Sequence, residues 1–406
     1  MNKDRHRLSF LVQEWRIFAF GISFQFFSSF GRTFYIAIFG GEIRSTFDLT
    51  PGEFSYIYSA ATLTGVLFIP WLGKRIDEVD LRPYAISMVV ILGLASFSIS
   101  VAPNLVILFA ALFGFRVTGG SMMNHTVVVT IARHFNKRRG IATSICSLGV
   151  PIAEAVLPIL AVLSMALMGW RMTWMVSGVF LSLIFGPVVF WILGSLRQDS
   201  SVSGDHANAA MRTSPPSATR REVLRDIQFY RLAPVLILPT PLVTALFFHH
   251  ATIAEIKEWS LEWLATCFVA YAGATVVASL AVGPLVDRHS AKIVLPWTVV
   301  PMVVGLIFLA YGTSAASAFI YMLCFGLTAG ARYTLTAVIW AETYGTRYLG
   351  SIRAVVHTIT MLLAGLSPAL LGWLIDQHVP IGTTVQVFAI LLIISAISAK
   401  GIVKRS

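Results

Sequence analysis

One short charged stretch decides the fold, because it occurs twice between long apolar runs. The first copy reads Gly73-Lys-Arg-Ile-Asp77-Glu-Val-Asp80-Leu-Arg82-Pro83. The second copy reads Gly283-Pro-Leu-Val-Asp287-Arg288-His-Ser-Ala-Lys292. In both copies a Gly stands four residues before an Asp, and basic residues follow. The copies lie about half of the 406-residue chain apart, so the repeat predicts a duplicated architecture.

The composition places this duplicated chain in a membrane. Hydrophobic residues make up 56% of the sequence and charged residues only 12%, whereas a soluble domain needs a largely polar exterior. A helix needs about 20 apolar residues to cross the hydrocarbon core. The sequence therefore predicts an all-α membrane protein with twelve transmembrane helices in two pseudo-symmetric six-helix bundles. The expected spans are 16–39, 53–72, 84–102, 104–132, 141–168, 171–195, 231–254, 262–285, 292–312, 315–340, 349–375 and 381–399.

The net charge of +11 follows from topology and does not call for a nucleic-acid partner. With twelve spans, most of the 30 Lys and Arg residues fall on one side of the membrane. The loops on the opposite side hold only Arg44, Arg171 and Lys257. This is the positive-inside pattern, which predicts that both termini lie in the cytoplasm and that the protein resides in the plasma or inner membrane.

The domain organisation follows from one extended hydrophilic stretch. Residues 196–230 are rich in Ser, Pro and Arg and predict a cytoplasmic linker. The linker separates an N-terminal six-helix bundle, residues 1–195, from a C-terminal six-helix bundle, residues 231–406.

The repeated stretch, the six-plus-six plan and the central basic linker resemble the major facilitator superfamily. The family signature in the loop between the second and third helices is Gly, three residues, Asp-Arg, one residue, Gly-Arg-Arg. Gly73, Asp77 and Arg82 match it, but Glu78 replaces the first Arg and Asp80 the Gly. The second copy keeps Gly283, Asp287 and Arg288. The resemblance implies that these loops lock the two halves together at the cytoplasmic side.

Two further stretches resemble this family. Arg133-His-Phe-Asn-Lys-Arg-Arg-Gly140 is similar to an aromatic–basic–Gly run found in many members. Its counterpart in the second half, Ala341-Glu-Thr-Tyr-Gly-Thr-Arg-Tyr-Leu-Gly350, with Ser351-Ile-Arg353 and Gly372-Trp-Leu-Ile-Asp376, looks most like the branch that contains the monocarboxylate and oxalate/formate carriers. The antiporter signature of the fifth helix is broken in Gly149-Val-Pro151-Ile-Ala-Glu154, which counts against drug/proton antiport.

Ionisable residues inside the spans are the main functional signal, since each needs a partner, water or a substrate. Four lie deep: Arg32, Arg116, Glu154 and Arg332. The surplus of positive charge favours an anionic substrate, because Arg binds a carboxylate through two parallel hydrogen bonds. The predicted substrate-binding residues are Arg32, Arg332, Arg116, Tyr35 and Tyr333. Snorkelling of Arg32 to the interface is the alternative for that residue.

Glu154 has two interpretations. Arg116 and Glu154 both fall near the midplane, so they form either a structural ion pair or a site where Glu154 carries a proton. His125 and His357 are further candidates for proton coupling, although a lone His in a helix is more often hydrogen-bonded in the packing. The adjacent His249 and His250 point in different directions on a helix and make a poor metal site.

The sequence favours a secondary transporter of a small organic anion, with a carboxylate as the expected class and proton symport by alternating access. No nucleotide-binding loop or catalytic motif occurs, so we expect no enzyme activity, no cofactor and no metal. The expected partners are the anion, a proton and the lipid bilayer, and the expected form is a monomer. One alternative is a proton-coupled exporter of drugs or metabolites. A second is a transporter-like sensor that binds without translocating.

Overall fold

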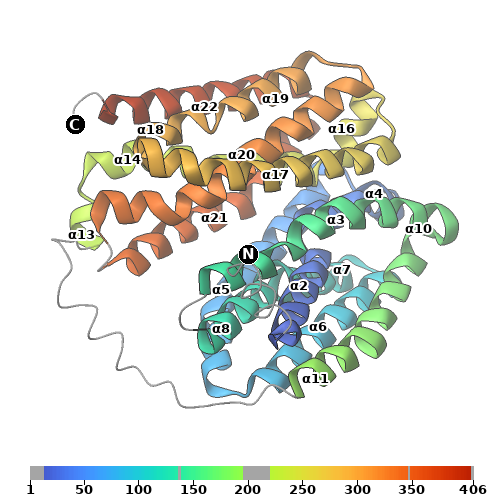
Figure 1. The fold of residues 1–406 in the computed structure, drawn as a ribbon. Helices are drawn as coiled ribbons and strands as arrows, with labels where there is room; N and C mark the ends of the chain where they lie inside the picture. Colours follow the sequence, from blue (N-terminus) through green and yellow to red (C-terminus); the bar gives the residue numbers. More distant parts are fainter. Residues whose placement is uncertain (1–12, 136–138, 195–219, 346–347, 404–406) are drawn as a thin grey trace, which may run out of the picture. The chain divides into compact units, whose positions relative to one another are not determined.

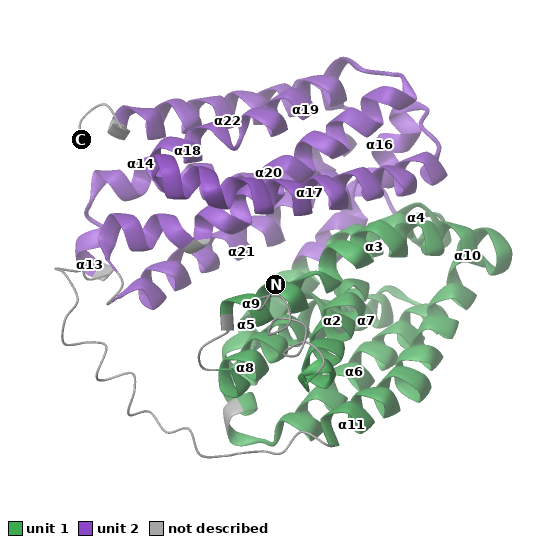
Figure 2. Ribbon diagram, in the orientation of Figure 1, with its two compact units in different colours: residues 1–48, 60–202 green, residues 49–59, 203–406 purple. Residues whose placement is uncertain are grey.

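The structure is a computed structural model that describes residues 13–135, 139–194, 220–345 and 348–403. Every element in these ranges is helical (Figure 1), which confirms the all-α fold class. Residues 196–219 of the expected linker, 196–230, lie outside the described residues. Two compact units divide the chain: unit 1 is residues 1–48 and 60–202, and unit 2 is residues 49–59 and 203–406 (Figure 2).

The helices follow the predicted order. Unit 1 contains α2 (Trp15–Ser28), η1 (Ser29–Gly31), α3 (Thr33–Ile38), α4 (Gly40–Phe47), most of α5 (Pro51–Glu78), α6 (Leu81–Val101), α7 (Leu105–Val117), η2 (Thr118–Met122), α8 (Met123–His134), α9 (Arg139–Ser147), α10 (Gly149–Phe180), η3 (Leu181–Phe185) and α11 (Gly186–Gly194). Unit 2 contains α13 (Arg220–Val223), α14 (Ile227–Ile237), α15 (Pro239–Phe248), α16 (His250–Lys257), α17 (Leu261–His289), α18 (Ala291–Val294), η5 (Leu295–Trp297), α19 (Val300–Tyr311), α20 (Ala315–Tyr344), α21 (Leu349–Asp376) and α22 (Ile381–Val403).

Ten stretches of the described chain are helical, long and apolar enough to cross a membrane, where the sequence predicts twelve spans. One of the ten, Gly140–Gly194, has 55 residues and would be about 80 Å long if straight, far more than one crossing of about 30 Å requires. It turns at Gly169, whose φ of 75° and ψ of 162° are not helical, so it holds the two predicted spans 141–168 and 171–195. The other difference is the first predicted span, which breaks at Arg32.

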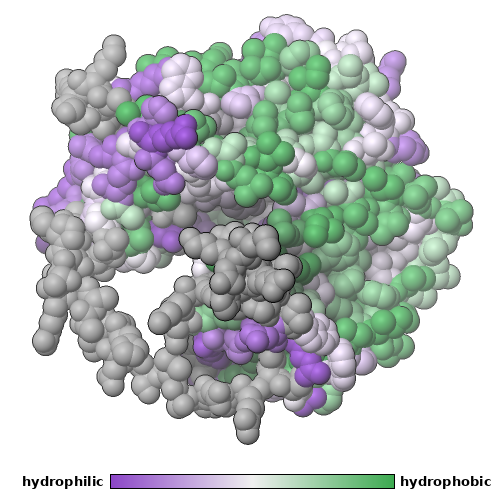
Figure 3. Space-filling view, in the orientation of Figure 1, coloured by the Kyte–Doolittle hydropathy of each residue, from purple (hydrophilic) through white to green (hydrophobic). Residues whose placement is uncertain are grey.

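Apolar side chains dominate the exposed surface. Leu67, Leu167 and Leu280 are 77%, 83% and 72% exposed, and Figure 3 shows broad apolar areas over α10 in unit 1 and α17 in unit 2. Such surfaces are stable in hydrocarbon but not in water. The chain is therefore a multi-pass membrane protein.

Most of each copy of the repeated stretch is helical, and only Val79–Asp80 and Ser290 interrupt the helices, so the loops are shorter than predicted. Gly73 and Asp77 lie in the last turns of α5, and Gly283, Asp287 and Arg288 lie in the last turns of α17. Neighbouring charges support the extension of α5, because Lys74 and Arg75 pair with Glu78 at 3.4 and 3.8 Å across one helical turn. In the second copy α17 ends before Ser290, which adopts a left-handed φ of 70°.

In unit 2, α17 and α20 pack closely along their backbones. At Gly326 and Gly330 a Cβ atom would collide with the backbone carbonyls of Tyr271 and Thr275. The hydroxyl of Thr275 also donates to the carbonyl of Gly326 at 3.3 Å. Small residues and hydroxyl groups at such contacts are what stabilise helix pairs in lipid.

The first turns of α5 belong to unit 2. Thr50 and Glu53 form a capping box, with bonds of 2.9 and 3.1 Å between the backbone N–H of each and the side chain of the other. Asp376, at the end of α21, accepts from the Thr50 hydroxyl at 2.8 Å and from the Gly52 N–H at 3.1 Å. Phe54 stacks on Phe248 of α15. These contacts explain why residues 49–59 group with α15 and α21.

Candidate functional site

The first transmembrane helix is discontinuous at the residue that the sequence marks as a substrate contact. The helix α2 gives way to the single 3-10 turn η1, and Arg32 then adopts an extended conformation with φ −86° and ψ 152° before α3 begins. No Pro lies in this segment. A helix broken at membrane depth is tolerated where its backbone is covered by protein or lines a polar cavity.

The break packs on a local distortion of the fourth predicted span. The segment Thr118–Met122 forms a π-helical turn, a feature found frequently at functional sites. Gly31 and Gly119 meet backbone to backbone: a Cβ on Gly119 would lie 2.6 Å from the carbonyl oxygen of Ser28 and 2.7 Å from the nitrogen of Gly31. Only glycine at these positions allows the broken helix and the π turn to touch.

Arg116 stabilises this junction. Its guanidinium Nη1 donates to the carbonyl oxygen of Gly31 at 2.9 Å. Because the break removes helical hydrogen bonds around residues 29–32, this charged donor satisfies an acceptor that would otherwise be costly to bury. Arg116 thus holds the shape of the site, and its guanidinium lies at the junction itself.

Glu154 is buried on α10, with 9% of its surface exposed. The cationic side chain that acts electrostatically on its carboxyl group is that of Arg32. The backbone brings α10 close to α2 at Gly149, where a Cβ would collide with the carbonyl oxygen of Ile22. An Arg116–Glu154 ion pair is one expectation from the sequence; in the structure the charge of Arg32 acts on Glu154, and Arg116 donates to the Gly31 carbonyl.

Buried polar atoms around the break have unused hydrogen-bonding capacity. Among the described residues, Gln25 Oε1, Ser29 Oγ and Arg32 Nε have no hydrogen-bond partner. The Nε2 atom of Gln25 donates to Oδ1 of Asn124 at 2.6 Å, which leaves its Oε1 available. Buried polar groups are nearly always satisfied, so these atoms are suited to a polar ligand or to water. Gln25 and Ser29 are not among the predicted site residues; their position about two turns and one turn before Arg32 in the same predicted span is the available signal.

Tyr35 lies in an aromatic core. It is 3% exposed, its ring lies 5.3 Å from that of Trp174 and 4.6 Å from that of Phe30, and its hydroxyl hydrogen-bonds to Ser177. Trp174 is fully buried and contacts Phe39 and Phe115 as well. Tyr35 therefore belongs to the aromatic cluster that packs against the break. Trp174 lies at the centre of this cluster and is not among the predicted site residues.

In unit 2 the predicted residues Arg332, Tyr333 and His357 lie on the neighbouring helices α20 and α21. Arg332 is partly buried on α20 and lies 5.4 Å from the ring of Tyr333, which is itself 53% exposed. Both Arg332 and Arg353 act electrostatically on His357 of α21. Within the described residues, Arg332 forms no ion pair with an acidic side chain. His125 lies in unit 1, with its ring 3.9 Å from where a Cβ of Gly73 would be.

The predicted lock residues make contacts within their own units. Arg82 donates to the carbonyl of Phe190 at 3.1 Å and lies over its ring, so it joins α6 to α11. The side chain of Asp77 lies outside the described residues. In unit 2, Glu342 accepts from the Ser290 hydroxyl and from the Ala291 N–H, which holds the turn after Gly283, Asp287 and Arg288 against α20. Glu342 was not a predicted lock residue.

The buried His pair diverges as predicted. Nε2 of His249 lies 2.9 Å from the carbonyl oxygen of Pro368, whereas Nε2 of His250 hydrogen-bonds to the hydroxyl of Tyr321. Because the two rings face different helices, α21 and α20, they cannot share a metal ion. Among the described residues, no group of three His, Cys, Asp or Glu side chains is placed to hold one.

Comparison with known proteins gives the class. The sequence pattern of the Major Facilitator Superfamily matches this chain twice, over residues 22–265 and 248–404. The chain belongs to that superfamily, and it is a secondary transporter rather than an enzyme. Together the two matches span most of the chain.

Solved structures show the same fold. Two crystal structures of a bacterial homologue of the human lysosomal transporter Spinster, both inward-facing, resemble this chain. The occupied form has a TM-score of 0.68 and 15% identity, covering 96% of each chain. The unoccupied form has a TM-score of 0.65 and 13% identity, covering 95% of this chain and 93% of that one. No curated protein matches the sequence.

Proposed function

We propose that this transporter moves a small organic anion, of the carboxylate class, together with a proton by alternating access. The observation that carries the proposal is that the charge of the half-buried Arg32, at the break in the first helix, acts on the buried carboxyl group of Glu154. The unused polar atoms of Gln25 and Ser29 surround that break. The resemblance of residues 341–350 to monocarboxylate and oxalate/formate carriers supports the same substrate class.

Arg32 is the proposed anion ligand of unit 1. Its guanidinium is held at the break by an extended backbone, and its Nε has no partner among the described residues. A guanidinium presents paired N–H donors that match a carboxylate. The hydroxyl of Ser29 supplies a further hydrogen bond to the bound anion.

Glu154 is the proposed proton carrier, and its position beside Arg32 explains the coupling. While Glu154 is ionised, its carboxylate competes with the substrate for the charge of Arg32. Protonation of Glu154 removes that competitor, so the guanidinium is available to the substrate carboxylate. One proton and one negative charge therefore bind together, and the buried charge stays balanced.

Arg332 is the proposed anion ligand of unit 2, with Tyr333 and His357 beside it. Substrate binding lowers the free energy of the closed intermediate relative to the open states, which is how binding drives the cycle. We further propose that the termini lie in the cytoplasm, that the protein resides in the plasma or inner membrane, and that it acts as a monomer.

Uptake by proteoliposomes tests the proposal. We expect accumulation of at least one short carboxylate when an inward proton gradient is imposed, and little without it. Arg32→Gln should reduce both uptake and exchange by about ten- to a hundredfold, because a hydrogen bond to a charged group contributes about 1.5–3 kcal/mol. Glu154→Gln should abolish gradient-driven accumulation but retain substrate exchange between loaded vesicles.

Glu42→Gln serves as the matched control, since Glu42 lies exposed on α4. It should behave as wild type in both assays. If no carboxylate is taken up, but outward transport of neutral or cationic amphiphiles is driven by the proton gradient, then the protein is an exporter and the anion proposal is wrong.

A further inference from the structure

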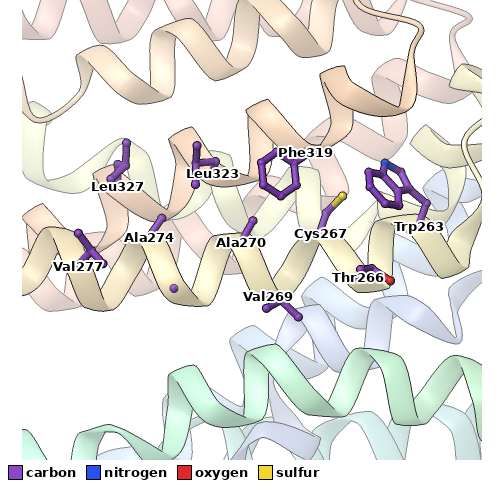
Figure 4. Close-up of a pocket in the computed structure, with 11 residues that line it drawn as sticks. Trp263, Thr266, Cys267, Val269, Ala270, Ala274, Val277, Phe319, Leu323 and Leu327 are labelled. Atoms are coloured by element: carbon purple, nitrogen blue, oxygen red, sulfur yellow. The ribbon is translucent and has the colours of Figure 1, made fainter.

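A long apolar groove runs along unit 2 between α17 and α20 (Figure 4). Its volume is about 600 Å³. The side of α17 contributes Ala270, Gly273 and Ala274, and the side of α20 contributes Phe319, Leu323 and Leu327. The groove lies outside the Arg32–Glu154 site, since it is formed entirely within unit 2.

The lining offers almost nothing to a polar ligand. The indole N–H of Trp263 is already donated to the carbonyl of Ala315 at 2.7 Å, and the Thr266 hydroxyl donates to the carbonyl of Glu262 at 2.9 Å. Water needs two to four polar partners, which this groove lacks. A peptide segment would bring backbone groups that cost several kcal/mol each if left unpaired. The occupant is therefore apolar along its whole length.

Two Trp residues lie at or beside one end of the groove. Trp263, at one end, lies in the first turn of α17, and the neighbouring Trp259 donates its indole N–H to Thr313 at 2.8 Å. Trp residues concentrate at the boundary between headgroups and hydrocarbon. From Trp263 to Val277 the helix rises about 21 Å. One leaflet of the hydrocarbon core is about 15 Å thick, half of the usual 30 Å, so the groove is long enough for one chain of that leaflet.

The middle of the groove is open at Gly273, which has no side chain. A Cβ on Gly273 would meet no atom within 4 Å, so the space above this glycine is not needed for packing within the protein. Val269 and Val277 flank it and are 46% and 62% exposed. An acyl chain gains dispersion contacts with these fixed walls that it does not have among mobile neighbours.

We propose that the groove between α17 and α20 binds one acyl chain of a membrane phospholipid, with the headgroup beside Trp263. This lipid is a resident of the C-terminal unit and not the transported substrate. The inference does not depend on the identity of that substrate.

Substitution of Gly273 tests the proposal without harming the fold. Gly273→Leu places a side chain in the groove at a helical position with free space, so thermal stability should be unchanged or raised. Gly283→Leu is the matched control, because its Cβ also meets nothing within 4 Å on the same helix and it does not line the groove. Native mass spectrometry after stepwise delipidation should show that Gly273→Leu loses one retained phospholipid that wild type and Gly283→Leu keep.

A second measurement tests whether the acyl chain lies beside Trp263. Phosphatidylcholine brominated on its acyl chains should quench the fluorescence of wild-type protein more than that of Trp263→Phe, and Gly273→Leu should remove this difference. Equal lipid retention by wild type and Gly273→Leu overturns the proposal, as does equal loss in Gly283→Leu. Displacement of the phospholipid by an amphipathic anion that is itself transported also overturns it, because the groove would then belong to the substrate.

Discussion

At the scale of single residues, three glycines allow the candidate site to form. Gly31, Gly119 and Gly120 lie where the broken first helix meets the π turn of the fourth span. The contact is between backbones, so no side chain can be inserted without moving one of the two segments. The charged residues Arg32 and Arg116 take their positions from this contact.

Gly119→Ala should therefore lower stability and transport together. The added Cβ would lie 2.6 Å from the Ser28 carbonyl oxygen, and overpacking of this kind costs about 1–3 kcal/mol. Thermal unfolding in detergent measures the change in stability. Uptake by proteoliposomes, compared with the Arg32→Gln variant, measures the change in transport.

Gly140→Ala provides the comparison, because Gly140 is an exposed helical residue whose Cβ would meet nothing within 4 Å. It should leave stability unchanged or increase it slightly. An equally stable and active Gly119→Ala protein would contradict the described contact between the two helices.

At the scale of elements, helix ends are fixed by side chains from distant segments. Asp376 caps the start of α5, Arg171 donates to the carbonyls of Ser100 and Ala102 at the end of α6, and Lys257 donates to Ala310 and Gly312 at the end of α19. Each contact satisfies backbone groups that a helix terminus leaves unpaired. Such caps define where the apolar spans stop.

Asp376→Ala should destabilise the start of α5. The change removes the acceptor for Thr50 Oγ1 and for the Gly52 N–H, and loss of a helix cap typically costs about 1 kcal/mol. Faster hydrogen exchange confined to the first turns of α5, compared with wild type, is the expected result. Glu42→Ala is a suitable control because Glu42 lies exposed on the preceding helix α4 and caps neither group. Uniform exchange changes in both variants would argue against a local role for Asp376.

At the scale of the whole molecule, the division into units does not follow the chain exactly. Residues 49–59 group with the C-terminal unit, while the rest of α5 groups with the N-terminal one. The N-terminal part of the chain thus supplies Phe54 and Tyr58 to the contacts around Phe248.

Separate expression of the two parts of the chain tests this division. Residues 203–406 alone should be less stable than when they are co-expressed with residues 1–202, because only the latter fragment carries residues 49–59. Co-purification of the two fragments, and recovery of transport, are the measurements. A 203–406 fragment as stable alone as in the pair would show that the 49–59 contacts contribute little.

The sequence by itself determined the class of protein. The length of the apolar runs, about 20 residues, follows from the thickness of the bilayer. The repeat around Gly73 and Gly283 indicates the duplication. Both features can be recognised without knowing which residues contact each other. The same reasoning found Arg32, Glu154 and Arg332, since charge within a span is visible in the sequence alone.

Only the tertiary structure decided which of these groups meet. The break at Arg32 has no Pro to announce it, because it depends on Gly119 and the π turn in another helix. The sequence places both Arg116 and Glu154 near the middle of their spans. In the structure, however, Arg116 donates to the Gly31 carbonyl, and the charge of Arg32 acts on Glu154. Depth along a helix follows from residue number, whereas the face that a side chain presents and the partner it finds depend on how separate helices pack.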